Sequence, residues 1–131
     1  MNSENTQQIT VLLVDDSPIA LTLLSKMLAA ASDIRVVGTA RNGVEALELI
    51  PQLDPKVICT DLHMPVMDGL DLTKEIMDRH PKPILVVSAS VSEGSGNIFQ
   101  LIEAGALDVF PKPRVEDAET FQRKSVELAN R

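Results

Sequence analysis

Five short apolar runs recur along this sequence, and a segment with the apolar spacing of a helix follows each of them. The runs occupy residues 9–14, 34–40, 56–60, 83–87 and 107–110. Helices are predicted at 18–31, 43–50, 66–79, a short stretch through Ile102 and Ala104, and 115–130. Strands and helices that alternate in this way form a parallel sheet with helices on both faces. We therefore predict one doubly wound α/β domain with a five-stranded parallel sheet over residues 9–131, preceded by a polar, disordered tail at 1–8.

Local signals indicate where some of these elements begin and end. Ser17 followed by Pro18 is typical of a helix N-terminus, because serine caps the free N–H groups and proline fits the first helical position. Pro51 and Pro55 are expected to bracket the connection from the second helix to the third strand. Gly105 is expected to be the glycine that ends the fourth helix.

Length and charge exclude several classes of function. A chain of 131 residues suits one domain with its own core. A net charge of −7 argues against nonspecific nucleic-acid binding, which needs clustered Lys and Arg. No apolar run approaches the ~20 residues of a membrane span, and the N-terminus lacks the pattern of a signal peptide. One cysteine, Cys59, cannot form an internal disulfide and is expected in the core, so we expect a cytoplasmic protein.

Five polar residues stand at the ends of the predicted strands: Asp15, Asp16, Asp61, Ser88 and Lys112. Parallel strands end at the same edge of a sheet, and open α/β sheets bind their ligands at the carboxyl edge. We therefore expect these side chains to converge. For the pair of aspartates alone, a capping role is as good an explanation, but the ordered set favours a functional site.

Three converging carboxylates repel one another and so either raise their own pKa values or recruit a cation. Hard oxygen ligands with open positions suit Mg²⁺, which shares its remaining positions with water and phosphate oxygens. A carboxylate beside the metal can act as a nucleophile toward phosphorus. The ammonium group and the hydroxyl group can then align and neutralise the phosphoryl oxygens.

Five separated motifs carry a resemblance to a known family: VLLVDDSP (11–18), Asn42-Gly43-Glu45-Ala46, TDLHMPVMDGL (60–70), VSAS (87–90) and AGALDVFPKP (104–113). In their order and spacing they resemble the receiver domain of two-component response regulators. The resemblance covers about residues 9–130. It implies a flavodoxin-like (βα)5 fold with strand order 2-1-3-4-5.

The resemblance also implies roles for the residues around the acceptor. Asp61 would accept a phosphoryl group from the phosphohistidine of a sensor histidine kinase. Asp16 would bind Mg²⁺ directly, Asp15 chiefly through water, and Asp61 and the backbone carbonyl of His63 would complete the protein ligands. Gly69 would shape the loop after the acceptor.

Two further residues would read the phosphoryl group: Ser88 through a hydrogen bond and Lys112 through its charge. Receivers usually carry Tyr or Phe three residues before the lysine, but Val109 stands at this position. Phe110 is next to it, and because strand side chains alternate between faces, we do not expect its ring to substitute.

Within the family, the motifs resemble most closely the receivers of chemotaxis protein-glutamate methylesterases. In those proteins the receiver is N-terminal and restrains a C-terminal esterase. We predict that this chain is itself no enzyme and switches an effector domain or partner through the face of the fourth helix, fifth strand and fifth helix. It would bind neither nucleic acid nor membrane.

Three other interpretations are weighed against this one. A stand-alone receiver with a different output fits the same residues. An aspartyl phosphatase of the haloacid-dehalogenase type needs an acid two residues after its nucleophile, where this chain has His63. A flavin-binding electron carrier needs a hydroxyl-rich phosphate loop after the first strand, where Asp15 and Asp16 would repel the phosphate.

Overall fold

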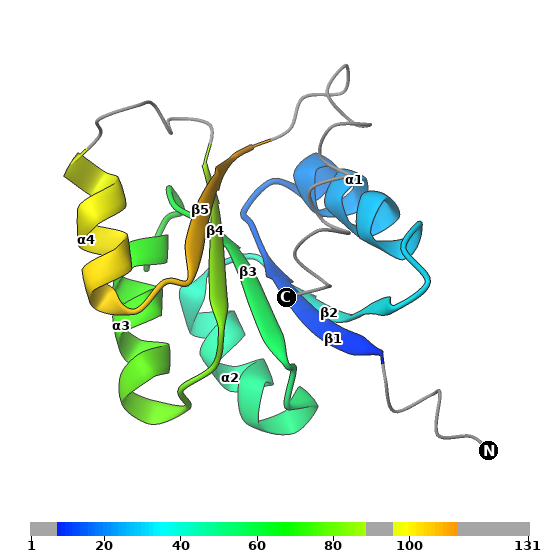
Figure 1. Ribbon diagram of the computed structural model, residues 1–131, viewed down its shortest axis with the longest axis horizontal. Coiled ribbons are helices and arrows are strands. Elements are labelled where there is room, and N and C mark those ends of the chain that lie inside the picture. The colour runs from blue at the N-terminus through cyan, green and yellow to red at the C-terminus, as the bar shows by residue number, and fades with distance from the viewer. Residues whose placement is uncertain (1–7, 89–95, 113–131) are drawn as a thin grey trace.

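The computed structural model describes residues 8–88 and 96–112 (Figure 1). Its strands are β1 (Ile9–Val14), β2 (Ile34–Ala40), β3 (Val57–Asp61), β4 (Ile84–Ser88) and β5 (Asp108–Pro111). Its helices are α1 (Pro18–Ala29), α2 (Gly43–Leu53), α3 (Gly69–Arg79) and α4 (Gly96–Ala104). Residues 1–7 of the predicted tail and the predicted helix at 115–130 lie outside the described residues. The disordered tail, this helix and the 9–131 extent of the domain therefore stay predictions.

The five strands form one parallel sheet in the order β2-β1-β3-β4-β5, which confirms the predicted fold class and strand order. Helix α1 covers one face, and α2, α3 and α4 cover the other (Figure 1). Because strand side chains alternate, Leu12 and Ile58 pack on the side of α2–α4, whereas Leu13 and Cys59 pack on the side of α1. Cys59 is therefore a core residue, as predicted.

Three strands lie one residue further along the chain than predicted. β3 begins at Val57 and β4 at Ile84, and their last residues are Asp61 and Ser88. The ladder continues to these positions because Asp61 pairs with Val87, and Ser88 with Pro111 of β5. Two of the predicted site residues are therefore held by the sheet itself rather than by the loops that follow it.

The predicted ends of α1 and α4 are largely correct. The Ser17 side chain accepts a hydrogen bond from the Ala20 backbone N–H at 3.2 Å, and Pro18 is the first helical residue, although α1 ends at Ala29, two residues early. Gly105 follows α4 with a φ of +119°, a left-handed conformation that glycine adopts without strain. Within the described residues, no helix is long and apolar enough to cross a membrane.

Two further helix boundaries differ from the prediction. Helix α2 continues through Pro51 to Leu53, since Leu53 packs against the core and the Asp54 N–H bonds to the Ile50 carbonyl at 2.8 Å. Helix α3 begins at Gly69 rather than at residue 66. The Asp68 carboxylate caps the helix by accepting a hydrogen bond from the Asp71 N–H at 2.8 Å. Val66 has a φ of +74°, which is left-handed and therefore incompatible with the helix.

Candidate functional site

The predicted site residues come together at the carboxyl edge of the sheet. Asp15 and Asp16 directly follow β1, Asp61 ends β3, Ser88 ends β4 and Lys112 directly follows β5. Asp15, Asp61 and Ser88 are buried, Asp16 is exposed and Lys112 is half-buried. The Lys112 backbone N–H donates to the Ser88 carbonyl at 2.9 Å, which joins the ends of β4 and β5.

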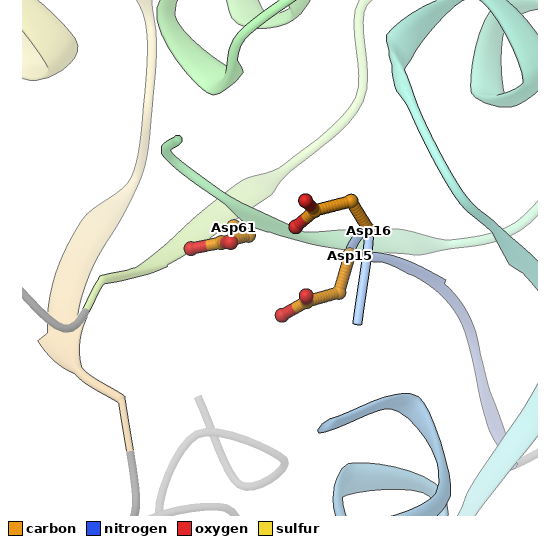
Figure 2. Close-up of side chains that lie close together, drawn as sticks. All are labelled: Asp15, Asp16 and Asp61. Atoms are coloured by element: carbon orange, nitrogen blue, oxygen red, sulfur yellow. The ribbon is translucent and has the colours of Figure 1, made fainter. Parts of the chain in front are cut away.

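The three aspartates form a compact group of carboxylates (Figure 2). One carboxylate oxygen from each of Asp15, Asp16 and Asp61 lies within 4.8 Å of the other two. Hard oxygen ligands of this kind are those that Mg²⁺ prefers in proteins. The group offers both buried and exposed ligands, so a cation held here keeps open positions on its solvent side.

Lys112 brings its ammonium group to two of the carboxylates. Its Nζ lies 2.7 Å from Asp15 Oδ2 and 3.4 Å from Asp61 Oδ2. Burial alone would lower the pKa of Lys112, but the contacts with Asp15 and Asp61 outweigh it, so the pKa is raised and the lysine stays charged. The buried Asp15 Oδ2 accepts no hydrogen bond among the described residues, so its contact with Lys112 is an ion pair.

The two oxygens of Asp61 have different partners. Oδ1 accepts a hydrogen bond from the Leu62 backbone N–H at 2.9 Å, whereas Oδ2 faces Lys112. Burial raises the pKa of Asp61, and the neighbouring negative charge of Asp15 raises it further, while Lys112 and the Leu62 N–H act in the opposite direction. A neutralising cation beside Asp61 would therefore stabilise its ionised form.

Asp15 is fixed by the backbone around it. Its Oδ1 accepts from the Ser17 N–H at 2.9 Å, and its own N–H donates to the Ala40 carbonyl at 3.0 Å. With Oδ2 paired to Lys112, both of its oxygens are engaged. Asp16 is exposed at the rim, which makes its carboxylate the most accessible ligand of the three.

The loop between β3 and α3 returns tightly to its starting point. The Gly69 N–H donates to the Leu62 carbonyl at 2.7 Å. A Cβ on Gly69 would overlap the Asp61 carbonyl oxygen and lie only 2.8 Å from Leu62 Cα, so only glycine fits. His63 and Val66 are exposed in this loop, and Val66 takes a left-handed φ of +74° that β-branched residues rarely adopt.

Val109 and Phe110 lie on opposite faces of β5, as the alternation of strand side chains predicts. Val109 packs against the core under α2–α4, and Phe110 packs against the core under α1. The aromatic ring of Phe110 is therefore on the wrong face to replace a ring at position 109.

One residue next to Asp61 was not singled out from the sequence. The Thr60 side chain is fully buried, and its hydroxyl donates to the Asp61 carbonyl at 2.9 Å. Thr60 lies inside an apolar run, and a hydroxyl among the β-branched residues of a strand carries little signal by itself.

The arrangement is matched by a known family. A sequence model described as the response regulator receiver domain matches residues 11–122, most of the chain. The chain is a response regulator receiver domain. Because acidic clusters that bind Mg²⁺ are general in this family, the group of Asp15, Asp16 and Asp61 is the part of this receiver that fits such an ion.

Relatives and solved structures show which kind of receiver this chain is similar to. A protein-glutamate methylesterase/protein-glutamine glutaminase of Hahella chejuensis is 47% identical over 114 residues, which are 86% of this chain and 32% of the relative. One from Methanococcus maripaludis is 43% identical over 106 residues, 81% of this chain and 29% of the relative. The crystal structure of the response regulator domain of Thermotoga maritima CheB superimposes with a TM-score of 0.84 and 31% identity, covering 95% of this chain and 98% of that chain.

The predicted likeness to the receivers of protein-glutamate methylesterases is thus confirmed. The receiver spans about a third of the length of these curated relatives. The phosphatase and flavin-carrier interpretations are not favoured by any of these likenesses.

Proposed function

We propose that this receiver accepts a phosphoryl group on Asp61 from the phosphohistidine of a sensor histidine kinase and thereby switches an effector. The observation that carries the proposal is the two-sided environment of the Asp61 carboxylate. Its Oδ1 is held by the Leu62 N–H, and its Oδ2 faces an ammonium group within a cluster of three carboxylates.

The chemistry follows from this environment. Asp61 Oδ2 forms a bond to phosphorus while the bond from phosphorus to the donor imidazole nitrogen breaks, and the electron pair of that bond stays on the imidazole. Transfers of this kind depend mainly on alignment and charge neutralisation. The Leu62 N–H keeps Oδ1 in place, so the nucleophilic oxygen is the one that points into the site.

Lys112 and Ser88 would bind the phosphoryl group once it is on Asp61. Lys112 Nζ lies 3.4 Å from the oxygen that becomes phosphorylated, and it can pair with a phosphoryl oxygen at small cost in movement. Ser88 is buried at the end of the neighbouring strand, from which its hydroxyl would bond to another phosphoryl oxygen. Ser88 ends β4 and Lys112 directly follows β5, so a movement of these two residues would alter the surface beside α4.

Mg²⁺ is the cation that the site would hold, through Asp16 and Asp61, through Asp15 by way of water, and through the His63 backbone carbonyl. When bound, it neutralises charge on the carboxylates and on the phosphoryl oxygens. Three carboxylates and one ammonium carry a net charge of −2 (−3 + 1), which a divalent ion balances.

The output that we propose is control of a methylesterase-like effector, because the relatives carry that activity in their names. The effector would contact the face made by α4, β5 and the segment after β5. Exposed apolar side chains on this side, Phe99, Ile102 and Leu107, support that choice.

Phosphorylation with a small acyl phosphate and Mg²⁺ tests the acceptor. Intact mass should increase by one phosphoryl group in the wild type and in Asp78→Asn, a control that removes an exposed carboxylate of α3. Asp61→Asn should remain unmodified. An adduct that persists in Asp61→Asn, or none in the wild type, rejects Asp61 as the acceptor.

A further inference from the structure

A fully buried hydroxyl group stands directly before the acceptor. Thr60 has no exposed surface and lies on the same face of β3 as the core residue Ile58. Burying a hydroxyl is unfavourable unless it finds a hydrogen-bond partner. The Thr60 Oγ1 finds one in the Asp61 carbonyl oxygen, at 2.9 Å.

That carbonyl belongs to the same peptide unit that holds the acceptor side chain. The unit contains the Asp61 C=O, which accepts from Thr60, and the Leu62 N–H, which donates to Asp61 Oδ1 at 2.9 Å. A peptide unit is planar and rigid, so fixing its carbonyl end fixes the direction of its N–H. A bond to the carbonyl also polarises the unit and strengthens the N–H as a donor.

The Leu62 N–H in turn fixes the orientation of the Asp61 carboxylate, by holding one of its two oxygens. The terminal torsion of an aspartate is broad, so without an anchor the carboxylate plane of Asp61 would rotate freely about the Cβ–Cγ bond. The N–H anchors Oδ1 and leaves Oδ2 toward Lys112, 3.4 Å away. The chain of contacts therefore runs from the Thr60 hydroxyl through one peptide unit to the orientation of the nucleophile.

We propose that Thr60 is a positioning residue for phosphoryl transfer, which sets the orientation of the Asp61 carboxylate through the 61–62 peptide. This inference rests on the proposed function of Asp61 as acceptor. Thr60 itself touches neither the phosphoryl group nor a metal ligand atom; it acts on the backbone of the acceptor.

The chain offers a matched control in Thr73. It is also fully buried, and its hydroxyl also donates to one backbone carbonyl, that of Gly69, at 2.7 Å. Thr60→Val and Thr73→Val each remove one buried hydroxyl with little change of shape, and Thr60→Ser restores the hydroxyl. Three quantities are measured for every variant: the rate of phosphorylation by a small acyl phosphate at saturating Mg²⁺, the affinity for Mg²⁺ alone, and hydrogen exchange of the Leu62 amide.

Thr60→Val should be phosphorylated about tenfold more slowly than the wild type, the size expected when a reacting group is slightly misplaced. Its Mg²⁺ affinity should fall, and its Leu62 amide should exchange faster. Thr60→Ser should recover the wild-type rate, and Thr73→Val should keep it despite a similar loss of stability. If Thr60→Val does not fold, Thr60→Ala compared with Thr60→Ser answers the same question.

Equal phosphorylation rates and equal Leu62 exchange in Thr60→Val and Thr73→Val would overturn the positioning role while leaving Asp61 as the acceptor. A wild type that takes up no phosphoryl group rejects the proposed function instead. In that case, faster Leu62 exchange in Thr60→Val than in Thr73→Val still supports the link from hydroxyl to carboxylate, and equal exchange rejects it.

Discussion

Replacing Lys112 by methionine tests whether one ammonium group balances the charge of the acidic cluster. Methionine keeps most of the length and apolar character of the side chain but removes its charge. The Lys112 Nζ contacts Asp15 at 2.7 Å and Asp61 at 3.4 Å, and these carboxylates are 1% and 8% exposed. The substitution therefore leaves two buried negative charges without their cation.

The magnitude follows from these distances. At an effective dielectric constant of about 20, the two attractions amount to about 6 and 5 kcal/mol. Three carboxylates with oxygens within 4.8 Å of one another repel by at least about 3.5 kcal/mol per pair, or about 10 kcal/mol together. The two attractions, about 11 kcal/mol together, are therefore of the same size as the repulsion that they oppose.

Net losses are smaller than these gross energies, because breaking a buried ion pair typically costs about 3–5 kcal/mol. The raised pKa of Asp61 lets it take up a proton in the variant, which relieves part of the repulsion. We therefore expect Lys112→Met to lower the free energy of unfolding by about 3 kcal/mol without metal. With Mg²⁺ this loss of stability should shrink, because the ion replaces the missing positive charge. We expect Mg²⁺ to bind the variant about tenfold more tightly than the wild type, which would reduce the loss by about 1.4 kcal/mol.

Urea unfolding followed by circular dichroism, in chelator and in excess Mg²⁺, measures both effects. Lys82→Met is a matched control: Lys82 Nζ lies 2.6 Å from Asp54 Oδ1, and the lysine side chain is 20% exposed, as is that of Lys112, but Asp54 is 86% exposed. An exposed pair contributes about 0–1 kcal/mol. If Lys112→Met loses no more stability than Lys82→Met, or loses the same amount with and without Mg²⁺, the charge-balance argument is wrong.

Two further predictions concern the backbone and the core behind the site. Gly69→Ala should lower the free energy of unfolding by about 2–3 kcal/mol and weaken Mg²⁺ binding, because the new Cβ would overlap the backbone of Asp61 and Leu62. An unchanged urea midpoint and an unchanged Mg²⁺ affinity would contradict this close approach of residue 69 to the Asp61–Leu62 backbone. Burial, with the charges of Asp15 and Asp61, raises the pKa of Cys59 from 9.0 to about 12. Alkylation of the thiol at pH 9 should therefore occur only when the protein unfolds. Rapid labelling of the folded protein would disprove this. The unfolded chain loses this proton first, so the Cys59 contribution makes stability fall as pH rises from 9.0 toward about 12.

The sequence was sufficient to predict which residues meet but not how they contact one another. Parallel strands end at one edge, so Asp15, Asp61 and Lys112 could be brought together from the positions of three apolar runs. Spacing carries no information about side-chain torsions. It therefore could not reveal that Lys112 lies closer to Asp15 than to Asp61, or that the Thr60 hydroxyl bonds to the Asp61 backbone.

The wrongly predicted end of α2 and start of α3 each have a physical cause. A proline predicts the end of a helix because it lacks an N–H and crowds the preceding turn. In α2 that local preference is overridden by tertiary packing, because Leu53 lies beyond Pro51 and contacts the core. In α3 the start is set by the Asp68 cap and by the left-handed Val66, neither of which follows from apolar periodicity.

The position of Lys112 would let the proposed phosphoryl switch act without an aromatic residue at position 109. The Lys112 ammonium lies nearer to Asp15 than to Asp61, and the Lys112 backbone N–H donates to the Ser88 carbonyl. Phosphorylation changes the charge at Asp61 from −1 to about −2 at neutral pH. If Asp61 is the acceptor, the added charge would draw Lys112 away from Asp15, and because Lys112 directly follows β5, the shift would act through the backbone on the ends of β4 and β5. Val109, packed into the core under α2–α4, then needs no ring movement for the acceptor to influence that edge.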